Sequence, residues 1–181
     1  MTGRDSSDLL IPLRTMQFIA AALFMGAMAF LGVTLFLRFG QAGAQPPPEI
    51  PTISYILTGV FVMNLFLALI IPSLFLRLQI QRISSIKITP SHSQDFEIPR
   101  RILSELLAIR STQLIITLAF IEGGTFACIV AFLIEGQIFM LIPVALGLFV
   151  ILLLFPTESR LEHWLTEQEE RLQELRRNIL E

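Results

Sequence analysis

Charged residues, cysteine and histidine are scarce in this chain. Of its 181 residues only 15% are charged, whereas 54% are hydrophobic, and the mean hydropathy is +0.71. Soluble domains carry about 25% charged residues, so the composition argues against an ordinary water-soluble protein. The single cysteine, Cys128, excludes an internal disulfide. Because it lies within an apolar segment, we expect it to be a small packing residue.

Motifs of catalysis and of metal binding are also missing. The sequence has no glycine-rich phosphate loop, zinc-protease motif or nucleophile elbow. His92 and His163 stand far apart, without cysteines or carboxylates at metal-ligand spacing. Ser84 and Lys87 have the spacing of a serine–lysine nucleophile pair, but no accompanying motif. We therefore expect no enzymatic activity, no cofactor, no metal site and no nucleic-acid partner.

Long apolar segments are what the chain has in abundance. Four of them cover residues 16–37, 53–76, 112–134 and 138–155. As helices they would be roughly 27 to 36 Å long, which matches a hydrocarbon layer of about 30 Å. They lack the alternation of barrel strands, and backbone groups in lipid must be hydrogen-bonded within their own segment. The sequence predicts an all-α fold, with a membrane-embedded four-helix bundle in residues 1–155.

The basic residues predict the orientation of these spans. Of the 13 lysines and arginines, all except Arg38 fall on one side of a four-span arrangement. The positive-inside rule then places both termini and the central loop in the cytoplasm, as expected for a multi-pass protein of a bacterial inner membrane. A cleaved signal peptide is the alternative, because residues 42–44 read Ala-Gly-Ala, but the first apolar segment is longer than a usual signal core.

Two stretches of sequence resemble each other at an offset of 96 residues. Residues 14–19 match residues 110–115, and Phe30 falls on Phe126 in the same register. The region of Pro72 resembles that of Pro156 in a similar way. These matches suggest that the four spans are two duplicated, parallel hairpins, although amphipathic helix starts also coincide by chance.

Helical patterns continue beyond the predicted spans. Residues 77–111 are expected to form a cytoplasmic helical hairpin with its turn at residues 89–96, and one helix is expected from Pro99 to Ile134. Residues 156–181 predict an amphipathic helix capped by Thr157. Its apolar seam consists of Leu161, Leu165, Leu172, Leu175 and Ile179. The seam either mediates association with another chain or packs against the protein's own cytoplasmic helices or the membrane surface.

Glu122 is the most conspicuous residue, because it lies at the middle of the third apolar segment. An ionised carboxylate costs at least about 2.5 kcal/mol there. Asn64 lies at the middle of the second segment, so we expect the two side chains to reach similar depths and to form a polar pair. The pair either joins helices as a structural clasp or forms an ion or proton site. The absence of a second ionisable residue in the spans favours the clasp.

Small residues surround Glu122 at helical spacing. We expect close helix packing at five of them: Ala119, Gly123, Gly124, Ala127 and, on the first segment, Gly26. This stripe with one mid-membrane carboxylate is faintly similar to the proteolipid hairpins of rotary ATPases. The entry Arg14-Thr15-Met16-Gln17 and the run from Glu122 to Phe126 resemble those of uncharacterised bacterial four-helix inner-membrane proteins. That resemblance implies a fold but no activity.

A non-enzymatic role follows as our main hypothesis from the sequence. We expect an integral inner-membrane structural or interaction subunit whose partners are the lipid bilayer and either further copies of itself or another membrane protein. The alternative is a small ion- or proton-coupled channel, transporter or ring subunit that uses Glu122.

Overall fold

The fold was analysed in a computed structural model, which describes residues 6–40, 49–85, 100–161 and 163–167. Its elements are α1 (Ser6–Gly40), α2 (Thr52–Ser85), α3 (Arg100–Glu135), the 3-10 helix η1 (Ile138–Met140) and α4 (Leu141–Leu153). A further helical segment, Glu158–Glu167, follows α4. None of the described residues forms a strand, which confirms the all-α prediction.

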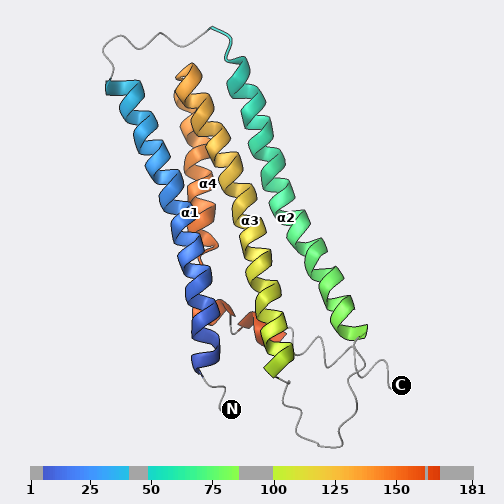
Figure 1. Cartoon of the computed structure of the whole chain (residues 1–181). Coiled ribbons are helices and arrows are strands. Elements are labelled where there is room, and N and C mark those ends of the chain that lie inside the picture. The colour runs from blue at the N-terminus through green and yellow to red at the C-terminus, as the bar shows by residue number, and fades with distance from the viewer. Residues whose placement is uncertain (1–5, 41–48, 86–99, 162, 168–181) are drawn as a thin grey trace, which may run out of the picture.

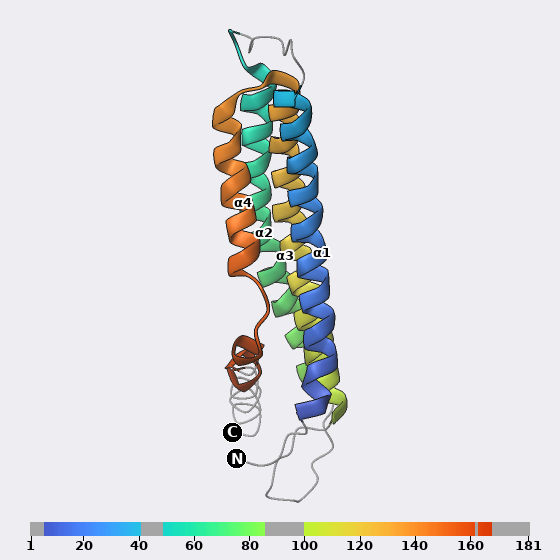
Figure 2. The ribbon, with the colours of Figure 1, turned by 90° about the vertical axis from the view of Figure 1, so that its left-hand side faces the viewer.

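The helix α3 is the centre of the molecule. It packs most extensively against α2, and also against α1 and α4, whereas α1 and α2 are not a closely packed pair. Figure 1 shows α1 and α2 on opposite flanks of α3, and Figure 2 shows α4 on one side of these three helices. We call the end where α1 and α3 finish the loop end, and the end where they begin the terminal end.

Three helical stretches are long and apolar enough to cross a membrane: Ile11–Gly40, Thr52–Phe75 and Leu107–Glu135. A fourth crossing is counted only if α4 with η1 and the segment Glu158–Glu167 form one span, and these two parts are bent by 74°. The apolar helix itself ends at Leu153, before Pro156, and its 13 residues extend over only about 20 Å. The described residues therefore have three to four candidate spans.

Helices continue beyond the apolar segments in the part of the chain that the structure describes. The helix α2 continues through Pro72 to Ser85, and α3 begins at Arg100, one residue after the predicted start. Helix also resumes after Thr157, whose carbonyl accepts from the amide of Leu161 at 3.1 Å. The predicted turn at residues 89–96 lies outside the described residues, as do Leu172, Leu175 and Ile179.

Buried side chains line α3 from one end to the other. The loop-end cluster includes Phe61, Cys128, Phe132 and Met140, so Cys128 is the packing residue that its position suggested. A middle cluster is centred on Leu118 and Ile121, and a terminal-end cluster contains Leu107 and Leu165. Large apolar side chains on the outer faces of α1 and α2 remain exposed. A hydrocarbon solvent accounts for these exposed faces, whereas water does not.

The helices α1 and α3 run in the same direction (Figure 1), and two pairs of residues at the offset of 96 lie side by side. The rings of Phe30 and Phe126, which are 96 positions apart, lie with their centroids 5.2 Å apart. Gly26 and Glu122, separated by the same offset, also face each other. A duplicated pair of parallel hairpins would have this arrangement, and the duplication itself stays a prediction.

Candidate functional site

Glu122 lies half-buried at the middle of α3, on the flank that faces α1. Its Oε1 atom would be 3.8 Å from a Cβ placed at Gly26, which is an ordinary van der Waals contact. The missing side chain at position 26 therefore leaves the carboxyl group room against α1. Part of Glu122 remains uncovered by its own chain, although an intramembrane carboxyl group is normally shielded inside a bundle.

Asn64 belongs to α2 and lies against another flank of α3, at Gly124. Its Cβ would be 3.3 Å from a Cβ at Gly124. Residues 122 and 124 point about 200° apart around a helix, so Glu122 and Gly124 face different neighbours. No hydrogen bond joins Glu122 to Asn64 among the described residues. The polar pair of Glu122 and Asn64 therefore stays a prediction.

The small residues around Glu122 fall into two groups. Gly124 is buried where α2 approaches most closely, because a Cβ there would be 3.1 Å from Cδ2 of Phe61 and 3.3 Å from its Cα. Ala119 and Gly123 are exposed and Ala127 is half-buried. A Cβ at Gly123 would meet nothing within 4 Å. Gly124 thus packs within the chain, whereas Ala119 and Gly123 form an open surface.

A second close helix contact, which the sequence prediction missed, joins α3 to α4 at Gly147. The hydroxyl group of Thr125 donates to the carbonyl of Ile121 at 2.8 Å and occupies the space beside Gly147. A Cβ at position 147 would overlap that hydroxyl oxygen and lie 3.2 Å from Cβ of Thr125. The one signal in the sequence is that Gly147 is the sole glycine of the fourth apolar segment.

Another contact that the sequence did not predict lies at the loop end, where Glu135 caps the neighbouring helix α2. Its Oε1 accepts from the amide of Ile53 and its Oε2 from that of Ser54, both at 2.8 Å. These amides belong to the first turn of α2, where a helix offers no internal acceptor. The turn after Glu135 uses Gly136 at φ +67°, and the Arg38 guanidinium occupies the space where a side chain at Gly136 would lie.

Leu161 and Leu165, the seam residues that the structure describes, pack within the same chain. Leu161 and Leu165 are buried with Leu13, Leu107 and Ile109. Trp164 is also buried there, and the guanidinium carbon of Arg110 lies 5.4 Å from the centre of its ring. Leu161 and Leu165 therefore pack on the protein's own helices.

Fold and site together define a class of protein: an all-α chain with several helices that are apolar and long enough to span a membrane, compatible with a multi-pass membrane protein. Comparisons with protein-family models, with curated proteins and with solved structures find no match.

Proposed function

We propose that this chain is a four-span, non-enzymatic subunit of a bacterial inner membrane that associates with a second copy of itself through one face of α3. This face consists of Ala119, Gly123 and the uncovered side of Glu122, with Gly26 of α1 at its edge. The observation that carries the proposal is that the central helix, otherwise the most covered one, exposes the small residues Ala119 and Gly123 here.

Small exposed residues are significant because of how helices associate in lipid. No hydrophobic force draws two apolar helices together in a bilayer, so close backbone approach and polar contacts stabilise their association. The outer faces of α1 and α2 carry large side chains such as Phe18, Phe36 and Phe66, which suit lipid. Gly123, by contrast, has open space around it and would let another helix approach closely.

Glu122 adds a polar reason for the same contact. Its half-buried carboxyl group faces Gly26 rather than a hydrogen-bonding side chain. A partner helix would cover the carboxyl group and would supply the groups with which it can hydrogen-bond, as intramembrane carboxyls usually require. Interhelical hydrogen bonds of this kind contribute about 0.6 kcal/mol on average, so close packing at Gly123 is expected to dominate.

The experiment is to replace Gly123 with leucine and to measure the mass of the detergent-solubilised or nanodisc-embedded protein. The new side chain has room within one chain, so folding should be kept, while the dimer should weaken by about tenfold or more. Gly59→Leu is the matched control, because a Cβ at Gly59 also meets nothing within 4 Å and α2 is not part of the proposed face.

A monomeric parent protein, or equal behaviour of the two variants, would overturn the proposal. A defined complex with a different membrane protein would keep the association role and replace the second copy as its partner. The ion-site alternative is tested in the same preparation: proton or sodium flux in the parent that disappears in Glu122→Gln would show that Glu122 serves transport instead.

The proposed orientation places the terminal end in the cytoplasm, because all basic residues except Arg38 are on that side of the four-span arrangement. A reporter fused after Glu181 or inserted at residues 89–95 is expected to be cytoplasmic, and one near residue 44 or at Gly136 external. An external reporter at Glu181 together with a cytoplasmic one at Gly136 would reverse the arrangement.

A further inference from the structure

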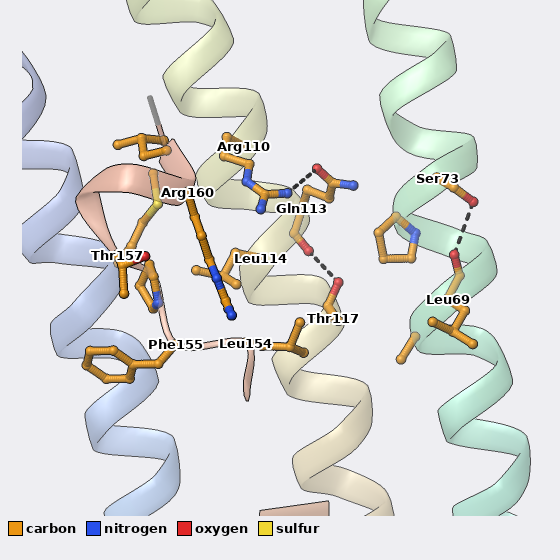
Figure 3. A pocket seen from close by; sticks show the side chains of 15 residues that line it. Leu69, Ser73, Arg110, Gln113, Leu114, Thr117, Leu154, Phe155, Thr157 and Arg160 are labelled. Carbon is orange, nitrogen blue, oxygen red and sulfur yellow. Dashed lines mark hydrogen bonds between the residues drawn. The ribbon is translucent and has the colours of Figure 1, made fainter. Parts of the chain in front are cut away.

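A cavity of about 260 Å³ lies toward the terminal end, beside the end of α4. Figure 3 shows its walls: Leu69 and Ser73 from α2, Arg110 and Gln113 from α3, and Arg160 from the segment after α4. Met16 of α1 also lines it, so the cavity is built where four separate parts of the chain meet. It is distinct from the face around Gly123 and Glu122.

Two guanidinium groups line this cavity. Arg110 is half-buried, and its Nη1 donates to Oε1 of Gln113 at 3.1 Å. Arg160 donates from Nη1 to the carbonyl of Leu153. None of the described residues that line the cavity is an aspartate or a glutamate. Two positive charges with remaining donors therefore face a partly enclosed space, which favours binding of an anion.

The rest of the lining restricts which anion fits. The hydroxyl of Thr157 and the amide of Gln113 add polar groups near the arginines, while Leu69, Leu114 and Leu154 form an apolar wall. Arginine forks match the paired oxygens of a phosphate group. An apolar wall beside them suits a molecule that carries a phosphate at one end and hydrocarbon at the other.

The position of the cavity agrees with this chemistry. It lies where α4 has ended at Leu153 and the chain turns by 74° into the segment Glu158–Glu167. Arg110 is only three residues inside the candidate span Leu107–Glu135. A site at this level of a membrane-spanning chain lies near the head groups, where basic pockets between helices bind anionic lipids.

We infer that this cavity binds a phosphate ester through Arg110 and Arg160. The ligand is either the phosphate of an anionic phospholipid, with its acyl chain along the wall of Leu69 and Leu154, or a soluble phosphate compound. Both sources present the same oxygens to the two guanidinium groups, and they differ in whether the apolar wall is used.

The fluorescence of Trp164 can report binding, because Trp164 is the only tryptophan of the chain and lies against Arg110. The full-length protein in neutral detergent is titrated with phosphatidylglycerol, with phosphatidylcholine, with glycerol phosphate and with inorganic phosphate, while its emission is recorded. We expect a saturable change with phosphatidylglycerol at concentrations at least tenfold below those of phosphatidylcholine. An equal response to the soluble phosphates would identify a soluble ligand.

The variants assign the response to the cavity. Arg160 is exposed, so Arg160→Gln should fold, and it should raise the half-saturating concentration about tenfold, since one charge-assisted pair is lost. Arg160→Lys keeps the charge without the fork and should have an intermediate effect. Arg14→Gln is the control, because Arg14 is exposed near the same end and does not line the cavity.

Three results would overturn the inference: no saturable response to any of the four probes, an unchanged half-saturation in Arg160→Gln, or an equal loss in Arg14→Gln. The last would mean that the general positive charge of this end attracts anions. None of these results depends on the oligomeric state, so the inference fails or stands independently of the proposed association through α3.

Discussion

Gly147→Ala is expected to lower the free energy of unfolding by about 2 kcal/mol, in the range of overpacked cores. The added methyl group would overlap the hydroxyl oxygen of Thr125 and lie 3.4 Å from Cε2 of Phe61. Thr125 would have to rotate and give up its hydrogen bond to Ile121, or α4 would have to move away from α3. Unfolding of the detergent-solubilised protein by heat or by a denaturing detergent measures the loss.

A double variant distinguishes this overlap from a general effect of alanine. Adding Thr125→Ala removes the oxygen that is in the way, so Thr125→Ala with Gly147→Ala should be more stable than the sum of the single changes predicts, by about 1 kcal/mol or more. Gly59→Ala is the control, since its Cβ has open space. If Gly147→Ala is as harmless as Gly59→Ala, the close contact between α3 and α4 is wrong.

Glu135→Ala is the second change with a large expected effect, again about 2 kcal/mol of unfolding free energy. It removes the acceptors of two amide hydrogen bonds in the first turn of α2, and hydrogen bonds to charged groups contribute about 1.5 to 3 kcal/mol. It also removes a negative charge from the positive end of the helix dipole. Glu135→Gln keeps one carbonyl acceptor and should cost about half as much.

Glu49→Ala is the matched control for this cap. Glu49 is an exposed carboxylate four positions before Ile53, so its loss changes the net charge of the same region equally. We expect Glu49→Ala to change the unfolding free energy by no more than about 0.5 kcal/mol. Equal losses in Glu49→Ala and Glu135→Ala would show that charge near α2, and not the two hydrogen bonds of Glu135, stabilises the loop end.

The cap joins helices that are far apart in the sequence. Glu135 belongs to α3, whereas its partners Ile53 and Ser54 begin α2, so the bonds tie the end of one helix to the start of another across 81 or 82 residues. Gly136 then turns the chain toward α4 beside Arg38. At the loop end, the two amide hydrogen bonds therefore fix the end of α3 relative to the start of α2.

The sequence by itself determined the helices and the apolar character of the chain. Hydropathy over about 20 residues and the positions of prolines depend on neighbouring residues only. They located the three candidate spans of α1, α2 and α3 to within about five residues at each end. The continuation of α2 through Pro72 and the helix after Thr157 were likewise readable from local pattern. The position of Glu122 within the third apolar segment also identified it as the charged residue at mid-span.

Only the tertiary structure decided which side of α3 each residue faces. Glu122 and Asn64 lie at similar positions along their helices, yet Glu122 faces α1 and Gly124, two residues later, packs beside Asn64 on α2. Depth along a span does not specify rotation about the helix axis. The rotation of a helix about its axis follows from packing against its neighbours. Only the packed structure shows that Gly124 and Gly147 lie at close helix contacts while Gly123 is open.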